Sequence, residues 1–248
     1  KITCYCYKKN KIHQLSTYYK NLKINFTNNL QDLLKSDAYF ITSPSDTHVK
    51  YIKYLIKHGY AYPCFCTSKR LDLIRQQQAS NKETIKYDRH CLKLDSEIVK
   101  QKMAVESHVF RMKIPSDEEI VFYDMVRDKI SINCMELDDQ ILIKSDGYPT
   151  YHFANVIDDH LMGVTHVMRG EEWLPSTPKH VILYDFFDWR LPKFIHLPLL
   201  LNHDRTKLSK RQGDVAVEDY LKKGFLPDAI LNFVALLGWN PKSDEEFF

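Results

Sequence analysis

A short run of cations between residues 207 and 211 is a prominent candidate for chemistry in this 248-residue chain. It consists of Lys207, Leu208, Ser209, Lys210 and Arg211, so three positive charges and a hydroxyl fall within five positions. Cations held ready for a developing negative charge stabilise it, which suits a site that handles phosphates. Taken alone, such a run is more often a solvated face, so the surrounding sequence has to decide.

A second candidate is a group of polar and charged side chains within residues 144–173. Tyr151 and Asn155 are four positions apart in an expected helix, which places them on one helix face. Arg169 follows at the end of an expected strand, and its planar guanidinium suits bidentate recognition of a carboxylate. The alternative is structural: Tyr151 would be a core residue and Asn155 a helix cap.

Three segments resemble one known family. The 207–211 run resembles the KMSKS signature of class I aminoacyl-tRNA synthetases, and residues 144–173 resemble the glutamyl enzymes of the bacterial and organellar type. Residues 224–239 also match these enzymes, so that the likeness extends from about residue 39 to 239. Glutaminyl-tRNA synthetases and the tRNA-modifying glutamyl-queuosine relatives differ in the middle segment.

The resemblance implies a glutamate–tRNA ligase. Such an enzyme activates L-glutamate with ATP and Mg²⁺ to glutamyl-adenylate and transfers the glutamyl group to the 3′ end of tRNA(Glu). Lys207 and Lys210 would be catalytic, stabilising the departing pyrophosphate. The glutamate-binding residues implied are Tyr151, His152, Phe153, Ala154, Asn155 and Arg169. The ATP-binding residues implied are Glu172, Lys207, Leu208, Ser209, Lys210 and Arg211.

Three of the six cysteines form a further candidate site. Some family members bind zinc with the spacing shown here by Cys64, Cys66, Tyr87 and Cys91. Where some members have a histidine ligand this chain has Lys93, although the neighbouring His90 could substitute. Three thiolates with one nitrogen or oxygen ligand would form a tetrahedral structural site. The alternative, a set of reduced and buried thiols without metal, stays open.

The resemblance implies an α/β fold. The chain would hold the C-terminal part of a class I Rossmann-type catalytic domain, an inserted α+β domain that binds the tRNA acceptor stem, and the start of a helical stem-contact region. The expected segments are an unassigned basic stretch (1–38), part of the catalytic fold (39–66), the insert (67–147), the second half of the catalytic fold (148–212) and the stem-contact region (213–248).

Local patterns predict the elements that would position these residues. Caps, apolar stripes and closing glycines predict helices over 44–57, 68–79, 150–160, 176–187, 215–223 and 227–237. Strands are predicted over 61–66, 109–114, 120–123, 129–134, 140–144, 163–170 and 194–201. The strands between 109 and 144 predict one small mixed sheet. The strand–helix alternation after residue 147 predicts parallel pairing, with ligands at the carboxyl ends of the strands.

Composition excludes several classes of protein. Hydrophobic residues make up 44% and charged residues 27% of the chain, which excludes wholesale disorder. The sequence has no apolar run of 18 residues, so we expect no transmembrane helix and no membrane partner. Six cysteines are too few for a disulfide scaffold. We expect a monomer, and the likeness to mitochondrial glutamyl enzymes favours the mitochondrial matrix over the cytoplasm.

One expected motif is missing from these 248 residues. Class I synthetases carry a first signature, HIGH, whose histidines and helix N-terminus bind ATP, and no such sequence occurs here. Two hypotheses therefore stay open. The chain is part of an active glutamate–tRNA ligase, or it is a non-catalytic paralogue that binds tRNA or nucleotide.

Overall fold

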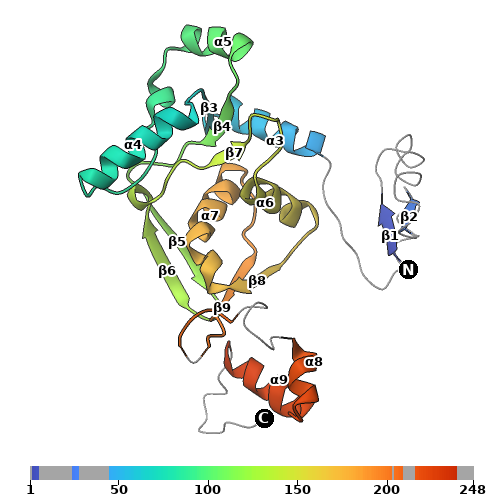
Figure 1. Cartoon of the computed structure of the whole chain (residues 1–248). Coiled ribbons are helices and arrows are strands. Elements are labelled where there is room, and N and C mark those ends of the chain that lie inside the picture. Colours follow the sequence, from blue (N-terminus) through green and yellow to red (C-terminus); the bar gives the residue numbers. More distant parts are fainter. Residues whose placement is uncertain (1, 6–23, 28–44, 203, 209–215, 239–248) are drawn as a thin grey trace.

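The computed structural model describes residues 2–5, 24–27, 45–202, 204–208 and 216–238 (Figure 1). Its strands are β1 (Ile2–Tyr5), β2 (Ile24–Thr27), β3 (Ala61–Cys64), β4 (Val109–Met112), β5 (Glu119–Asp124), β6 (Asp128–Asn133), β7 (Ile141–Ile143), β8 (His166–Gly170) and β9 (Lys193–Leu197). Its α-helices are α3 (Ser45–Lys57), α4 (Ser68–Ser80), α5 (Ser96–Val105), α6 (Tyr151–Leu161), α7 (Thr177–Phe186), α8 (Val217–Lys222) and α9 (Pro227–Leu236). Short 3₁₀ helices are η2 (His90–Lys93), η3 (Cys134–Glu136) and η4 (Glu171–Ser176).

The described strands form three sheets. β1 and β2 pair in parallel, and β3, β4 and β7 form an antiparallel sheet in that order. The third sheet has the order β6-β5-β9-β8 (Figure 1). In it, the β5–β6 hairpin is antiparallel, whereas β9 runs parallel to both β5 and β8. The parallel pairing predicted after residue 147 is confirmed, because β8 and β9 run parallel with α7 between them in the chain.

The expectation of one small sheet between residues 109 and 144 is wrong. β4 pairs with β3 on one side and with β7 on the other, whereas the β5–β6 hairpin joins the sheet of β8 and β9. The reason is burial: Phe122 of β5 packs with Val181 of α7 and Phe194 of β9. Apolar alternation identifies a strand, but its partner is set by such long-range packing. The domain boundaries expected from the sequence stay predictions.

The helices follow their local signals closely. α3 buries Ile52 and Leu55, and Gly59 at φ +74° follows its end in a conformation that favours glycine. Val49 of the same helix is 38% exposed. The Thr67 side chain caps α4 by accepting from the Arg70 amide.

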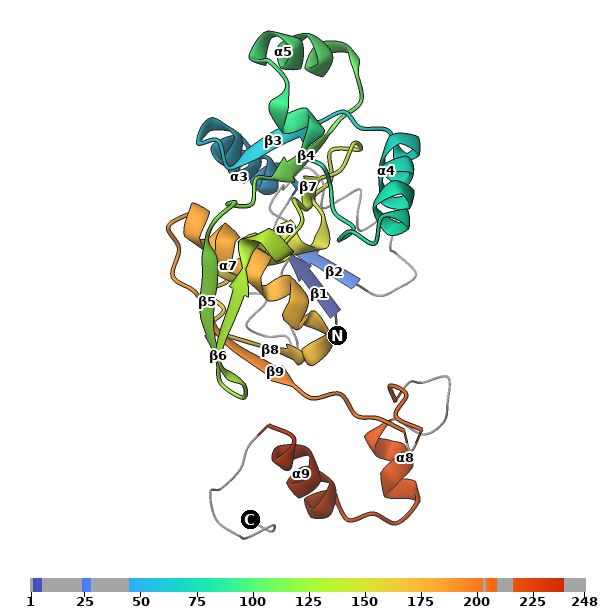
Figure 2. The same ribbon diagram turned by 90° about the vertical axis from the view of Figure 1, so that its left-hand side faces the viewer.

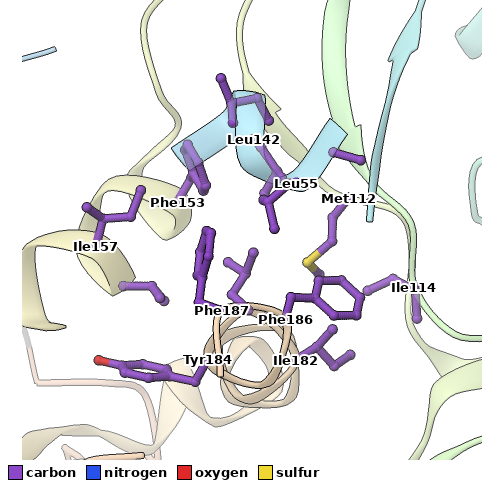
Figure 3. Close-up of a cluster of buried hydrophobic side chains, with 14 of the residues drawn as sticks. Leu55, Met112, Ile114, Leu142, Phe153, Ile157, Ile182, Tyr184, Phe186 and Phe187 are labelled. Atoms are coloured by element: carbon purple, nitrogen blue, oxygen red, sulfur yellow. The ribbon is translucent and has the colours of Figure 1, made fainter. Parts of the chain in front are cut away.

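The main core lies between α3, α6, α7 and the sheet of β3, β4 and β7 (Figure 3). Leu55, Met112, Leu142, Phe153 and Ile157 are all fully buried in it or nearly so. Their apolar surface, removed from water, fixes the rotation of α6 about its own axis. The face of α6 that carries Tyr151 and Asn155 is thereby turned away from this core.

Two polar residues at the end of α6, Asp158 and His160, have structural contacts. His160 stacks on Trp189 with ring centroids 3.7 Å apart. Asp158 accepts a hydrogen bond at 3.1 Å from Nε2 of the buried His48 on α3. These contacts fasten α6 to its neighbours.

α8 and α9 follow β9 and lie beyond the end of its sheet (Figure 2). They match the helices expected over 215–223 and 227–237 to within a few residues. Among the helices that the structure describes, none has the length and the hydropathy needed to cross a membrane.

Candidate functional site

Arg169 lies near the carboxyl end of β8, one residue before the strand ends at Gly170. Its half-buried guanidinium donates from Nε to Nε2 of His196, at 3.0 Å, and from Nη2 to the hydroxyl of Thr177, at 2.7 Å. His196 belongs to the neighbouring parallel strand, and Thr177 begins α7. Two elements therefore fix the direction of the arginine side chain.

Asp124 fixes His196 in turn. The carboxylate lies 2.6 Å from Nδ1 of His196 and also accepts from its backbone amide. Both side chains are fully buried. Burial opposes ionisation of Asp124, but hydrogen bonds from His196, Val126 and Arg127 lower the pKa of its carboxyl. For His196, burial lowers the pKa of the imidazole. The pair therefore consists of a carboxylate and a neutral imidazole.

The charge of Arg169 has only neutral hydrogen-bond partners among the described residues. His196 and Thr177 carry no charge, and burial lowers the pKa of Arg169. Tyr151 and Asp159 are near enough to act on it electrostatically without forming an ion pair. The chemistry of a half-buried guanidinium in this state suits pairing with a carboxylate.

One face of α6 borders this arginine. Asn155 acts on the Asp159 carboxyl one turn further on and lowers its pKa, but burial has the larger effect and raises it. Tyr151 is 55% exposed, and its ring lies 5.3 Å from the ring of Trp173. The structure thus brings Tyr151, Asn155 and Arg169 to one neighbourhood, while their roles in binding stay predictions.

The other residues expected in the glutamate site have different surroundings. Nδ1 of His152 lies 3.0 Å from Nε2 of His180, and burial lowers the pKa of both, that of His180 to about 3. These two imidazoles are therefore neutral. Phe153 is fully buried in the main core, on the opposite side of α6 from Tyr151. Ala154 is half-buried, and its amide continues the helix by bonding to the carbonyl of Thr150.

Three of the predicted nucleotide residues, Glu172, Lys207 and Leu208, belong to the described residues. Nζ of Lys207 donates to Oε1 of Glu172 at 2.5 Å, which joins the cationic segment to η4. The amide of the half-buried Leu208 bonds to the carbonyl of Leu200. The adjacent Glu171 pairs with Arg127. Three of the predicted residues, Ser209, Lys210 and Arg211, lie outside the described residues.

The predicted cysteine site converges in space. The sulfur atoms of Cys64, Cys66 and Cys91 all lie within 4.8 Å of one another. The Tyr87 hydroxyl is 3.4 Å from the sulfurs of Cys64 and Cys66, so all four predicted ligands meet. Hydrogen bonding by Cys91, and then by Tyr87, lowers the pKa of Cys64 despite its burial. Arg70 also donates to the sulfur of Cys66 at 3.3 Å.

Sequence reasoning missed three residues of the arginine site, namely Asp124, Thr177 and His196. In the sequence, Asp124 lies in an Asp-rich stretch typical of a turn. It lies 72 positions before His196, so the sequence does not show that the two residues are in contact. One weak signal exists: His196 is a polar residue within an apolar strand segment, and such residues need a buried partner.

The comparison with known families decides the identity of the fold. The profile described as tRNA synthetases class I (E and Q), catalytic domain, matches residues 8–248. The chain belongs to this class I synthetase family. The α/β arrangement is accordingly that of a class I tRNA synthetase catalytic domain.

Similar proteins agree with this family. A glutamate–tRNA ligase of Alkaliphilus metalliredigens is 55% identical over 200 residues, covering 80% of this chain and 41% of the relative. One of Clostridioides difficile is 52% identical over 211 residues, covering 85% of this chain and 43% of the relative. The synthetase chain thus spans about two fifths of the length of these curated relatives.

Solved structures extend the agreement to three dimensions. The crystal structure of a glutamate tRNA ligase from Elizabethkingia meningosepticum, in complex with its amino acid, superposes with a TM-score of 0.69. It is 38% identical, and the match covers 82% of this chain and 46% of that chain. A glutamate–tRNA synthetase structure from Elizabethkingia anophelis gives the same values.

Proposed function

We propose that the protein carrying this chain is a glutamate–tRNA ligase, which activates L-glutamate with ATP and transfers it to tRNA(Glu). The observation that carries the proposal is Arg169, a cation with neutral partners at the carboxyl end of a parallel strand. Ligands of α/β sheets bind at such strand ends. The names of the relatives support glutamate as the amino acid and do not favour the non-catalytic alternative.

In this proposal Arg169 binds one carboxylate of glutamate, and the Tyr151 hydroxyl and Asn155 amide hydrogen-bond the same substrate. An oxygen of the α-carboxylate attacks the α-phosphorus of ATP, and the bond to the pyrophosphate oxygen breaks. Lys207, beside Glu172, stabilises the charge of the departing pyrophosphate, together with Lys210 and the Mg²⁺ that accompanies ATP. A terminal hydroxyl of the tRNA then takes the glutamyl group from the adenylate.

The test is glutamate-dependent exchange of pyrophosphate into ATP, measured with the whole protein in the presence of tRNA. Arg169→Ala removes the carboxylate receptor and is expected to raise the KM for glutamate by about a hundredfold, because a buried charged partner contributes about 2–5 kcal/mol. Arg75→Ala is the matched control, since Arg75 forms an exposed ion pair with Asp72 on α4. The absence of exchange in the unsubstituted protein would refute the ligase proposal.

We also propose a structural zinc ion at Cys64, Cys66, Tyr87 and Cys91. The donors fit: three sulfurs and a phenolic oxygen converge, and hydrogen bonding by Cys91 lowers the pKa of the Cys64 thiol. Zinc would crosslink the end of β3 to η2. The test is the metal content of protein purified without chelator, where about one equivalent is expected. Cys64→Ser should lose the metal, whereas Cys134→Ser, at a buried cysteine elsewhere, should retain it. Metal-free unsubstituted protein that is folded would refute the site.

The expected mitochondrial location and monomeric state stay predictions. The relatives named above are bacterial, and a bacterial relative does not identify a compartment. Cell fractionation with an antibody to the protein tests the location. Sedimentation velocity tests the oligomeric state.

A further inference from the structure

We infer that His196 is a positioning residue for Arg169, held by Asp124 as the neutral imidazole that carries its proton on Nδ1. In this form His196 orients the guanidinium and leaves its positive charge available to a carboxylate substrate. The inference rests on the proposed function, in which Arg169 is the receptor for a carboxylate of glutamate. Asp124 and His196 act only through Arg169.

The two contacts of the His196 ring define its tautomer. Nδ1 of His196 lies 2.6 Å from a carboxylate oxygen of Asp124, which can only accept a hydrogen bond, so the proton is on Nδ1. Nε2 lies 3.0 Å from Nε of Arg169, which can only donate, so Nε2 carries a lone pair. A doubly protonated imidazole would direct an N–H at the N–H of the arginine. Both contacts therefore require the same neutral tautomer.

Further hydrogen bonds hold the Asp124 carboxylate in place. Its carboxylate also accepts from the amides of Val126 and Arg127, which close the β5–β6 hairpin, and from the amide of His196. The carboxylate is thus held by two strands and a turn: Oδ1 accepts from the turn amides, and Oδ2 faces Nδ1 of His196. This leaves the imidazole with one orientation, and its lone pair with one direction.

The positive charge of Arg169, unlike that of several other arginines, is not paired with a carboxylate among the described residues. Four other arginines, Arg70, Arg75, Arg89 and Arg127, form ion pairs with carboxylates. Arg169 forms no ion pair among the residues described. The guanidinium has five N–H donors, of which the contacts to His196 and Thr177 use two. A carboxylate in place of His196 would neutralise the cation and weaken its attraction for an anionic ligand.

The experiment separates the two halves of the imidazole. In His196→Asn the amide can take the place of Nδ1, keeping a donor to Asp124 but removing the acceptor for Arg169. In His196→Gln the longer side chain can take the place of Nε2, restoring an acceptor for Arg169. Both are assayed in the whole protein by glutamate-dependent pyrophosphate exchange, with the free energy of unfolding measured in parallel.

The Asn variant is expected to raise the KM for glutamate about tenfold or more, since a hydrogen bond to a charged group contributes about 1.5–3 kcal/mol. The KM for ATP and kcat should change much less. The Gln variant should return the KM for glutamate to within about threefold of the unsubstituted protein. His48→Asn and His48→Gln are matched controls, because His48 is also a buried histidine bonded to an aspartate, Asp158. They should lower stability and leave the KM for glutamate unchanged.

Three results would overturn the inference. The Asn and Gln variants could show the same KM for glutamate, or the KM could follow the loss of stability in the His196 and His48 variants alike. The third is spectroscopic: ¹⁵N shifts of the His196 ring at neutral pH should show the proton on Nδ1 alone, and a proton on Nε2 would contradict it. Because the ring spectrum needs no turnover, it decides the tautomer even if the unsubstituted protein shows no exchange and the ligase proposal fails.

Discussion

Replacing Asp139 is expected to cost more stability than replacing an exposed aspartate. Asp139 is 1% exposed and precedes β7. Its carboxylate accepts from the Tyr62 hydroxyl at 2.6 Å, from Nη2 of Arg89 at 2.8 Å and from the Ile114 amide at 3.1 Å. One side chain thus joins β3, the start of η2 and the segment after β4.

The cost can be worked out from these three donors. In Asp139→Ala the Tyr62 hydroxyl and the Ile114 amide stay buried and lose their acceptor, at about 1–3 kcal/mol each. Arg89 adds little, because its side chain is 27% exposed and can regain water. The sum is a loss of about 2–6 kcal/mol, which brackets the roughly 3–5 kcal/mol typical when one partner of a buried ion pair is removed. Asp139→Asn keeps one acceptor and should lose about 1–3 kcal/mol.

The assay is urea unfolding followed by tryptophan fluorescence and extrapolated linearly to water. Asp72→Ala serves as the control, because the Asp72–Arg75 pair is exposed and should contribute less than about 1 kcal/mol. An Asp139→Ala variant as stable as the Asp72→Ala variant would refute the reasoning. So would an Asp139→Asn variant that is less stable than Asp139→Ala.

Three further outcomes follow from burial and geometry. The pKa of His180 is about 3 when folded and about 6.5 when unfolded, so only the unfolded chain gains a proton as the pH falls from 6.5 to 5. The free energy of unfolding should therefore decrease by up to about 1.4 kcal/mol for each unit by which the pH is lowered in this range. In urea titrations at several pH values, His180→Asn should show a smaller dependence of this free energy on pH. An unchanged dependence would contradict the prediction. Gly170→Ala places a Cβ against the Glu172 carboxylate, so the KM for ATP should rise several-fold while unfolding changes by less than about 1 kcal/mol. Leu55→Ala should lose about 2–5 kcal/mol, against less than about 1 kcal/mol for the exposed Val49→Ala, and equal losses would contradict the packing described for α3.

The helices were predictable because their signals are local. The cap at Thr67 and the apolar positions Ile52 and Leu55 lie within the helices that they define, and the structure has helices there. Strand positions were equally local. Strand partners were not, since β5 is held in its sheet by residues of α7 and β9 some 60 to 70 positions later. Alternation of apolar residues carries no information about such partners.

The residues of the candidate site were also predictable only in part. Arg169, Tyr151 and Asn155 stand in a segment whose spacing and family resemblance mark them, and the structure brings them near one another. Asp124 and His196 carry no such mark, because an aspartate at a turn and a histidine in a strand are common. Their importance comes from a contact between strands, and only the folded chain shows it.

Because Asp124 and His196 are 72 positions apart, the two are synthesised at different times, and their contact can form only late in translation. The β5–β6 hairpin leaves the ribosome first, and its neighbour β9 follows some 70 residues later. Closing that loop costs entropy that is offset only once β9 pairs and Phe194 packs on Phe122. β3, β4 and β7 can meanwhile form their own sheet, since all three have already been synthesised. During translation Arg169 thus gains its contact with His196 last, so an elongation arrest before residue 193 leaves a chain that has most of its core but lacks this contact.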